Sequence, residues 1–152
     1  MMHDGWKPLP AISGGCQCGA VRFAVRAGPG KASVCHCRMC QRATGNDFAP
    51  LIEVPSDRAT LTGRVTLFAS SSLAERGFCA TCGTPLFYRG TARDTVEFML
   101  GAVDAPWPYD PVANHGVESR MPWLVRLNTL PDRETFLDDG EVLISHQSPE
   151  GR

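Results

Sequence analysis

The spacing of the cysteines constrains this chain more than any other feature. Three cysteines lie in the stretch CHCRMC at residues 35–40, and we call them the cysteine triplet. The other four form two pairs, which we call the cysteine quartet: Cys16 and Cys18, then Cys79 and Cys82. An odd total of seven at C-x-C and C-x-x-C spacings indicates metal sites rather than a secreted disulfide framework.

The quartet and the triplet predict two different zinc sites. Structural zinc takes four cysteine or histidine ligands in a tetrahedron, whereas catalytic zinc keeps three protein ligands and one open position. We therefore predict two zinc ions per chain, one structural and one catalytic. The closed structural site uses Cys16, Cys18, Cys79 and Cys82, and the open catalytic site uses Cys35, Cys37 and Cys40. An open site implies a substrate.

Other interpretations of these cysteines were weighed. A redox role for Cys79 and Cys82 is disfavoured, because Gly83-Thr84-Pro85 follows where a thioredoxin-like fold would begin a helix. The triplet site could instead be closed by His36, His115 or another side chain, which would make it purely structural. His36 is awkward as a ligand, because in an extended segment it would point away from the sulfurs on either side.

Length and composition indicate an ordinary globular protein. The chain has 152 residues, of which 43% are hydrophobic and 20% are charged, enough for one domain with its own core. A net charge of −1 offers no positive field for nucleic acid or anionic lipid. No apolar run has the length of a signal peptide or of a membrane span. We therefore expect a cytoplasmic protein that binds neither a membrane nor a nucleic acid.

Local patterns predict a mainly β fold with little helix. Residues 20–25 alternate, with Val21, Phe23 and Val25 on one face, and Gly28-Pro29-Gly30 is expected to end that strand. Residues 38–45 predict one or two helical turns that Gly45 ends. Further strands are expected at residues 49–54, 65–69, 86–89 and 95–100, and a long loop at 104–111 with Trp107 and Tyr109 against the body.

The predicted organisation is one zinc-binding domain with two extensions. Residues 1–12 look like an N-terminal arm, residues 13–125 form the domain, and residues 126–152 are expected to pack on it. The apolar run Val142-Leu143-Ile144 is compatible with an edge strand or with a contact in a homo-oligomer.

An open site with three thiolates favours thiol chemistry. Three thiolates donate more negative charge than three imidazoles, which makes the metal a weaker Lewis acid and water activation less favoured. A substrate thiol in the fourth position would be deprotonated, as coordinating thiols are. This predicts addition of a small thiol to a small carbonyl compound, or the reverse reaction.

Four segments carry a resemblance to a known family. GCQCGAVRF at residues 15–23, CHCRMC at 35–40, FCATCGTPL at 78–86 and HGVESRMPW at 115–123 resemble the glutathione-dependent formaldehyde-activating enzyme family, also called the centromere-protein-V domain, over about residues 13–125. The resemblance implies a zinc β-tent fold of short antiparallel strands and the same division of the cysteines. It also implies condensation of glutathione with formaldehyde to S-(hydroxymethyl)glutathione, a carbon–sulfur lyase reaction in reverse.

One alternative function accompanies this hypothesis. The chain could be a non-catalytic zinc module for protein interaction or metal handling, which predicts a closed second site.

Other side chains are weaker candidates for the substrate site. Arg38 and Arg42 could bind substrate carboxylates, but we expect them to be solvated. His115 could carry protons, but we expect a packed, hydrogen-bonded histidine. Phe48, Trp107 and Trp123 could line a pocket, although aromatic residues more often belong to the core.

Overall fold

The computed structural model describes residues 5–106, 108–135 and 137–149. In this part of the chain eleven strands account for most of the regular structure, with one α-helix and four short 3-10 helices. None of the described helices is long and apolar enough to cross a bilayer. The mainly β fold predicted from the sequence is thus confirmed.

The elements follow one another along the chain as follows. The strands are β1 Lys7–Leu9, β2 Ile12–Gly15, β3 Arg22–Val25, β4 Gly28–Cys35, β5 Ala49–Pro55, β6 Ala59–Thr62, β7 Val65–Ser71, β8 Ala74–Cys79, β9 Pro85–Gly90, β10 Thr95–Met99 and β11 Pro111–His115. The helices are α1 Arg38–Thr44 and the 3-10 helices η1 Ser56–Arg58, η2 Leu100–Ala102, η3 Val117–Ser119 and η4 Pro122–Thr129.

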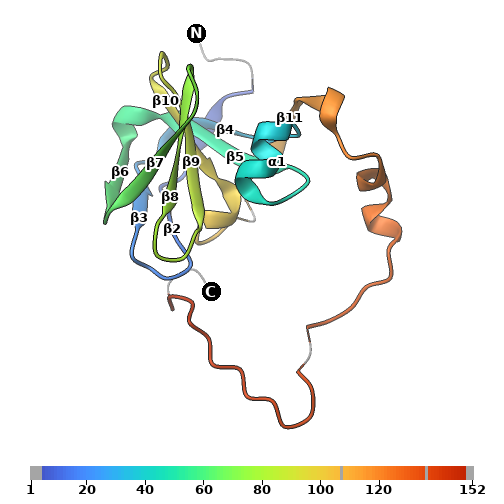
Figure 1. Cartoon of the computed structure of the whole chain (residues 1–152). Helices are drawn as coiled ribbons and strands as arrows, with labels where there is room; N and C mark the ends of the chain where they lie inside the picture. Colours follow the sequence, from blue (N-terminus) through green and yellow to red (C-terminus); the bar gives the residue numbers. More distant parts are fainter. Residues whose placement is uncertain (1–4, 107, 136, 150–152) are drawn as a thin grey trace.

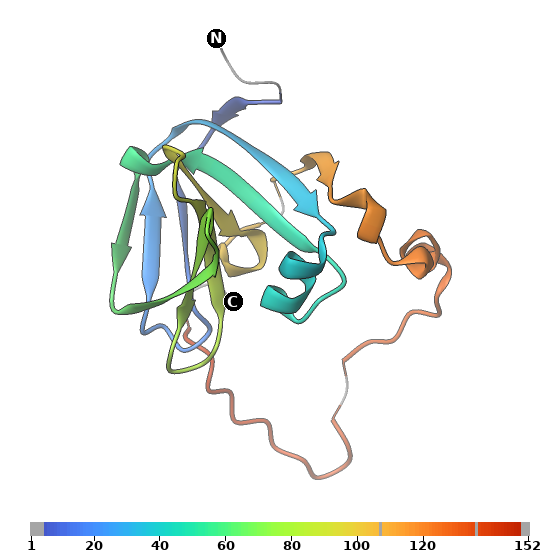
Figure 2. The same ribbon diagram turned by 45° about the horizontal axis from the view of Figure 1, so that its top comes forward.

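The strands form a large sheet and a small one (Figures 1 and 2). The large sheet has the order β1-β4-β5-β10-β9-β8-β7, and β11 joins it beside β4. The small sheet has the order β2-β3-β6. Neighbouring strands are antiparallel except for β11, which runs parallel to β4. That parallel pair departs from the expectation of antiparallel strands only, and it brings the chain after residue 110 to the end of β4.

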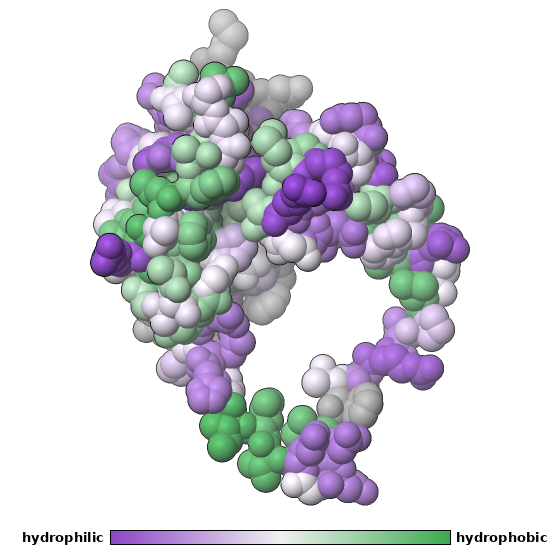
Figure 3. Space-filling model, viewed as in Figure 1, coloured by the Kyte–Doolittle hydropathy of each residue, from purple (hydrophilic) through white to green (hydrophobic). Residues whose placement is uncertain are grey.

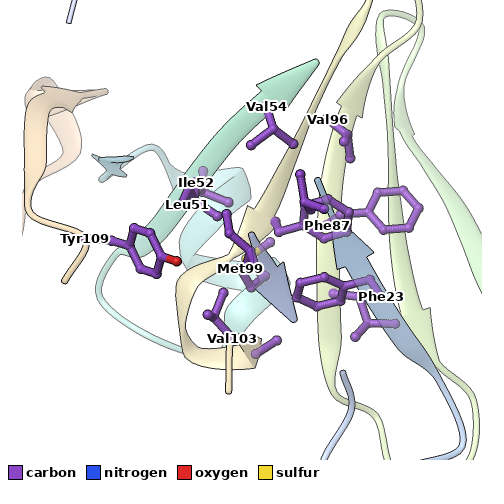
Figure 4. Close-up of a cluster of buried hydrophobic side chains, with 14 of the residues drawn as sticks. Phe23, Leu51, Ile52, Val54, Phe87, Val96, Met99, Val103 and Tyr109 are labelled. Carbon is purple, nitrogen blue, oxygen red and sulfur yellow. The ribbon is translucent and has the colours of Figure 1, made fainter. Parts of the chain in front are cut away.

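The hydrophobic core joins the two sheets (Figure 4). Phe23 of β3 stacks on Phe98 of β10 with ring centroids 4.2 Å apart, and Phe87 of β9 meets Phe98 edge-on at 6.1 Å. Such aromatic pairs add about 0.5–1.5 kcal/mol each beyond the area they bury. Val21, Phe23 and Val25 are buried, as their alternation predicts.

Several sequence predictions are confirmed and others fail. Helix α1 ends at Gly45, which has a left-handed φ of 64°, and Tyr109 is buried. Trp107 lies outside the described residues. Strand β3 ends at Val25, and Gly28-Pro29-Gly30, which was expected to end that strand, instead begins β4 and pairs with β1. At Gly30 a Cβ atom would lie 2.8 Å from the Glu53 carbonyl oxygen, so glycine is required by packing rather than by a turn.

The C-terminal segment extends away from the body and returns to it (Figure 1). Between residues 131 and 149 the described residues form no helix or strand, so the edge strand considered for Val142-Leu143-Ile144 is absent. These three side chains are exposed, and Figure 3 shows apolar surface on this segment. The segment meets the body where the Ser148 backbone N–H donates to the Gln17 carbonyl oxygen at 2.6 Å.

Candidate metal centres and substrate cavity

The cysteine quartet links a turn of the small sheet to a turn of the large one. Cys16 and Cys18 follow β2, Cys79 ends β8, and the four Sγ atoms lie within 4.8 Å of one another. The Cys16–Cys18 and Cys18–Cys79 sulfur distances are 3.5 and 3.8 Å. Zinc–sulfur bonds of about 2.3 Å in a tetrahedron imply a sulfur–sulfur edge of roughly 3.8 Å. The residues present therefore fit a tetrahedral zinc ion.

Tight turns hold both cysteine pairs of the quartet. The Val21 N–H donates to Cys16 Sγ at 3.2 Å, and Gly19, with a φ of 79°, turns the chain between them. In the second pair the Gly83 N–H donates to the Cys79 carbonyl oxygen at 2.8 Å, and Gly83 has a φ of 77°. Such glycine turns direct backbone N–H groups toward sulfur, which is favourable for thiolate ligands.

The cysteine triplet lies where β4 passes into α1. Cys35 ends β4, Cys37 is the N-cap of α1, and Cys40 lies in the first turn of that helix. The Cys40 N–H donates to Cys37 Sγ at 3.4 Å, and the three sulfurs lie within 4.8 Å of one another. Among the described residues no histidine or carboxylate joins this group.

His36 faces away from the sulfurs, as expected for an extended segment. Its ring is buried, lies 5.9 Å from the Phe48 ring between centroids, and its Nε2 atom is 2.9 Å from Asn114 Oδ1. The His36 backbone N–H donates to the His115 carbonyl oxygen at 2.8 Å. His36 therefore fastens the triplet to β11 and is not grouped with its sulfurs.

The segment after β11 presses against the triplet. Gly116 has a φ of 61°, and a Cβ atom there would lie 2.6 Å from the Cys37 backbone nitrogen. The Gln41 side-chain amide donates to the His36 carbonyl oxygen at 2.7 Å and to the Ser119 carbonyl oxygen at 2.9 Å. Residues 116–119 thus contact the segment that carries the cysteine triplet, although the two are far apart in sequence, and they hold it in one conformation.

All three triplet cysteines line a cavity of about 280 Å³, which we call the triplet cavity. This volume is close to the lower end of the range for small-molecule sites, roughly 300–1,000 Å³. Six further ionisable side chains of the cavity lining come from five strands of the large sheet and the β9–β10 turn: Lys31, Glu53, Arg76, Tyr88, Glu97 and Arg93. The triplet is therefore open to a ligand.

Arg76 connects the triplet to the cavity wall. It is buried, its Nη2 atom lies 3.4 Å from Cys40 Sγ, and its guanidinium lies 5.0 Å from the centroid of the Tyr88 ring. Burial raises the pKa of the Cys40 thiol, while the hydrogen bond from Arg76 acts to lower it. Arg76 thus favours the thiolate form, which is the form that binds metal.

With this geometry in view, comparison with known proteins decides the family. The model of the family described as glutathione-dependent formaldehyde-activating enzyme matches residues 11–119, more than half of the chain. The chain belongs to this family. Its cysteine quartet and cysteine triplet both lie inside the matched region.

Individual relatives agree with that membership. A Schizosaccharomyces pombe protein named as an uncharacterized lyase is 32% identical over 83 residues, which are 55% of this chain and 61% of the yeast protein. A Halomonas elongata protein, provisionally named as a glutathione-dependent formaldehyde-activating enzyme, is 27% identical over 124 residues, covering 74% of this chain and 79% of its own length. The first alignment thus spans less than two thirds of its relative.

A solved structure supports the fold. A crystal structure of a Rhodobacter sphaeroides protein superimposes with a TM-score of 0.54 at 22% identity, covering 67% of this chain and 98% of that one. At this identity the likeness concerns the fold alone.

Other candidate residues of this family member lie in different surroundings. Arg38 and Arg42 are exposed on α1 and line a separate hollow with Gln41, not the triplet cavity. Trp123 is 37% exposed in η4, and Phe48 packs near His36. His115 does line the triplet cavity.

Sequence reasoning missed the charged wall of the cavity. Arg76 lies in β8, which was not recognised as a strand, and Glu97 lies in a strand that was recognised but looked like an ordinary half-exposed position. A usable signal for Glu97 was its place between Val96 and Phe98, since alternation fixes it on the opposite face from two buried residues.

Proposed function

We propose that this protein is a zinc-dependent enzyme of the carbon–sulfur lyase type. Its substrate is a small thiol such as glutathione, and its second substrate is formaldehyde or another small carbonyl compound. The observation that carries the proposal is that three cysteine sulfurs lie together and all line one cavity. The domain that performs this function spans residues 13–125.

The proposal assigns different roles to the two cysteine groups. The quartet, Cys16, Cys18, Cys79 and Cys82, holds a structural zinc ion, and its sulfurs lie in two tight turns. The triplet, Cys35, Cys37 and Cys40, would hold the catalytic zinc ion, and the substrate thiol would reach it through the triplet cavity. Support comes from the thiolate donor set, from the cavity, and from the names of the family and its relatives.

The reaction balances without a further reactant. The thiol sulfur forms a bond to the carbonyl carbon, the π electron pair of the C=O bond moves to oxygen, and the proton lost by the thiol ends on that oxygen. The product is a hydroxymethyl thioether when the carbonyl compound is formaldehyde. When bound, zinc supplies a fourth coordination position that keeps the substrate thiol deprotonated at neutral pH.

The chain's own residues orient and shield the reactants. Met39 and Leu51 give the triplet cavity apolar walls, which limit competition from water. Arg76 donates to Cys40 Sγ and offsets part of the negative charge of three thiolates. The backbone contacts of β11 and Gly116 hold Cys35 and Cys37 in place before substrate arrives.

The direct test is the rate at which zinc-loaded protein interconverts glutathione, formaldehyde and S-(hydroxymethyl)glutathione, followed by NMR exchange spectroscopy. We expect acceleration over the uncatalysed exchange, and its loss in Cys40→Ser. Equal exchange with and without the protein would overturn the proposal and favour a zinc module without catalysis.

A further inference from the structure

Five polar side chains form a row across the large sheet, one on each of five neighbouring strands. The strand register pairs Lys31 of β4 with Glu53 of β5, Glu53 with Glu97 of β10, Glu97 with Tyr88 of β9, and Tyr88 with Arg76 of β8. Directly paired residues point to the same face of a sheet. All five also line the triplet cavity, so the row lies along one wall of the substrate site.

Most members of this row already have a partner. Lys31 Nζ lies 3.3 Å from Glu53 Oε2, and the Thr95 hydroxyl donates to Glu53 Oε1 at 3.0 Å. At the other end, Arg76 donates to Cys40 Sγ and lies over the ring of Tyr88. Lys31 and Glu53 thus form an ion pair at one end of the row, and Arg76 has polar and aromatic contacts at the other end.

Glu97, at the centre of the row, is the exception. Within the described residues its carboxylate has no hydrogen bond and no ion pair. Burial, and secondly the neighbouring charge of Glu53, raise the pKa of Glu97 to about 7. Arg93, Lys31 and Arg76 act in the opposite direction but do not offset these two effects. An ionised Glu97 therefore has no ion-pair partner among the described residues. A positively charged group of a ligand could supply that partner.

Two arginines give this wall of the cavity positive charge beside Glu97. Arg76 is only 8% exposed, lines the same cavity, and its Nη1 atom has no hydrogen-bond partner in the described part of the chain. Buried donors without partners are rare in folded proteins and call for an explanation. Arg93, exposed in the β9–β10 turn, adds a positive charge to the wall of the cavity near Glu97.

The missing positive group is better supplied by an ammonium than by a metal ion. A divalent cation needs six or more oxygen ligands or a dedicated set of carboxylates, and Glu53 is already paired with Lys31. An ammonium donates three hydrogen bonds and needs only one strong acceptor. The cavity also contains the triplet, so its ligand carries a thiol and an ammonium in one small molecule.

We propose that Glu97 binds the ammonium group of the thiol substrate, so that the cavity selects thiols with a free α-amino group whose neighbouring carboxylate faces Arg93. This inference rests on the proposed function, because it assumes that the thiol binds at the triplet. It narrows the substrate class from small thiols to amino-acid thiols, and glutathione satisfies it through its γ-glutamyl end.

The test compares two ligands that differ only in the amino group. Glutathione and its des-amino analogue, glutaryl-cysteinylglycine, are titrated into zinc-loaded protein by calorimetry. We expect glutathione to bind 10-fold to 100-fold more tightly, as for a charge-assisted hydrogen bond. The preference is expected to grow between pH 6 and pH 8 as Glu97 ionises.

Two matched variants assign the effect to one residue. Glu97→Gln is expected to bind both ligands with equal affinity. Glu75→Gln, one residue before Arg76 on β8 and so on the opposite face, is expected to keep the preference for glutathione. Equal affinity of the wild-type protein for the two ligands would overturn the inference, whether or not the Glu97 variant folds.

A third ligand separates this inference from the proposed function. S-methylglutathione keeps the ammonium but has no free thiol. If glutathione and its des-amino analogue bind equally while S-methylglutathione binds weakly, the inference fails and the proposed function stands. If S-methylglutathione binds as tightly as glutathione, or if no ligand binds, thiol binding at the triplet fails and this inference fails with it.

Discussion

At the scale of single residues, the charges around the triplet are set by side chains on the large sheet. Arg76 is a buried cation beside Cys40, and Glu97 is a half-buried acid without a partner in the described residues. Both lie in strands that bring them to the cavity although neither is near the cysteines in sequence. Two predictions follow from their surroundings.

Replacing Arg76 is expected to weaken metal binding at the triplet. Arg76→Met keeps an apolar stem but removes the hydrogen bond to Cys40 Sγ and the positive charge. Loss of a side chain that hydrogen-bonds to a metal ligand costs about 10-fold to 100-fold in metal affinity. Competition with a zinc chelator measures the effect, and the quartet zinc in the same protein is the control. Unchanged release of both zinc ions would contradict the prediction.

Replacing Glu97 is expected to change how stability depends on pH. The folded pKa of about 7 lies above the usual value of 4.5, so between these values the folded state binds more protons than the unfolded state. Stability from this group is therefore lost as pH rises. From pH 6 to pH 8, Glu97→Gln should gain about 1 kcal/mol relative to wild type. Urea unfolding of both proteins at both pH values measures this. The same difference in unfolding free energy at pH 6 and pH 8 would refute the prediction.

At the scale of elements, β11 and the residues after it hold the triplet from outside. The pairing of His115 with Cys35 and the contact of Gly116 with Cys37 come from a segment that follows the loop expected at residues 104–111 and for which the sequence predicted no strand. A five-residue strand that begins at Pro111 gives no periodic signal, because it pairs on one side only and most of its residues are exposed.

A pair of glycine substitutions tests this clamp. Gly116 and Gly45 both have left-handed φ values, 61° and 64°, so alanine at either costs about 1–2 kcal/mol. A Cβ atom at Gly116 would also lie 2.6 Å from the Cys37 nitrogen, whereas at Gly45 nothing lies within 4 Å. We expect Gly116→Ala, but not Gly45→Ala, to reduce zinc content at the triplet. Equal zinc contents in folded samples of both variants would argue against the clamp.

The difference between local and long-range features explains how far the sequence predicts the fold and the site. Cysteine spacing and glycine positions predicted two groups and a helix ending at Gly45, because these depend on neighbouring residues. The strand β4 and the row from Lys31 to Arg76 depend on register between strands far apart in sequence. The raised pKa of Glu97 depends in part on Glu53, which lies opposite it only after β5 and β10 have paired.

At the scale of the whole molecule, the quartet links the end of β2 in the small sheet to the end of β8 in the large sheet. Cys18 and Cys79 are 61 residues apart, so a shared zinc ion closes a long loop. Structural zinc can contribute on the order of 10 kcal/mol of apparent folding free energy. The triplet, in contrast, lies within one short segment and closes no comparable loop.

Serine substitutions in the two groups are therefore expected to differ. Cys79→Ser should unfold the protein or lower its melting temperature steeply, because the quartet loses its metal. Cys40→Ser should leave a folded protein with one zinc ion, because the quartet remains. Circular dichroism and zinc analysis measure both outcomes. Equal destabilisation by the two substitutions would mean that the triplet is structural as well.

The central claim is that the triplet holds a metal ion with a position open to a thiol. The measurement that tests it most directly is the absorption spectrum of the cobalt-substituted protein during titration with glutathione. We predict two cobalt ions per chain and a spectral change on adding glutathione that is absent with S-methylglutathione and absent in Cys40→Ser. A two-cobalt spectrum that glutathione leaves unchanged would contradict the claim.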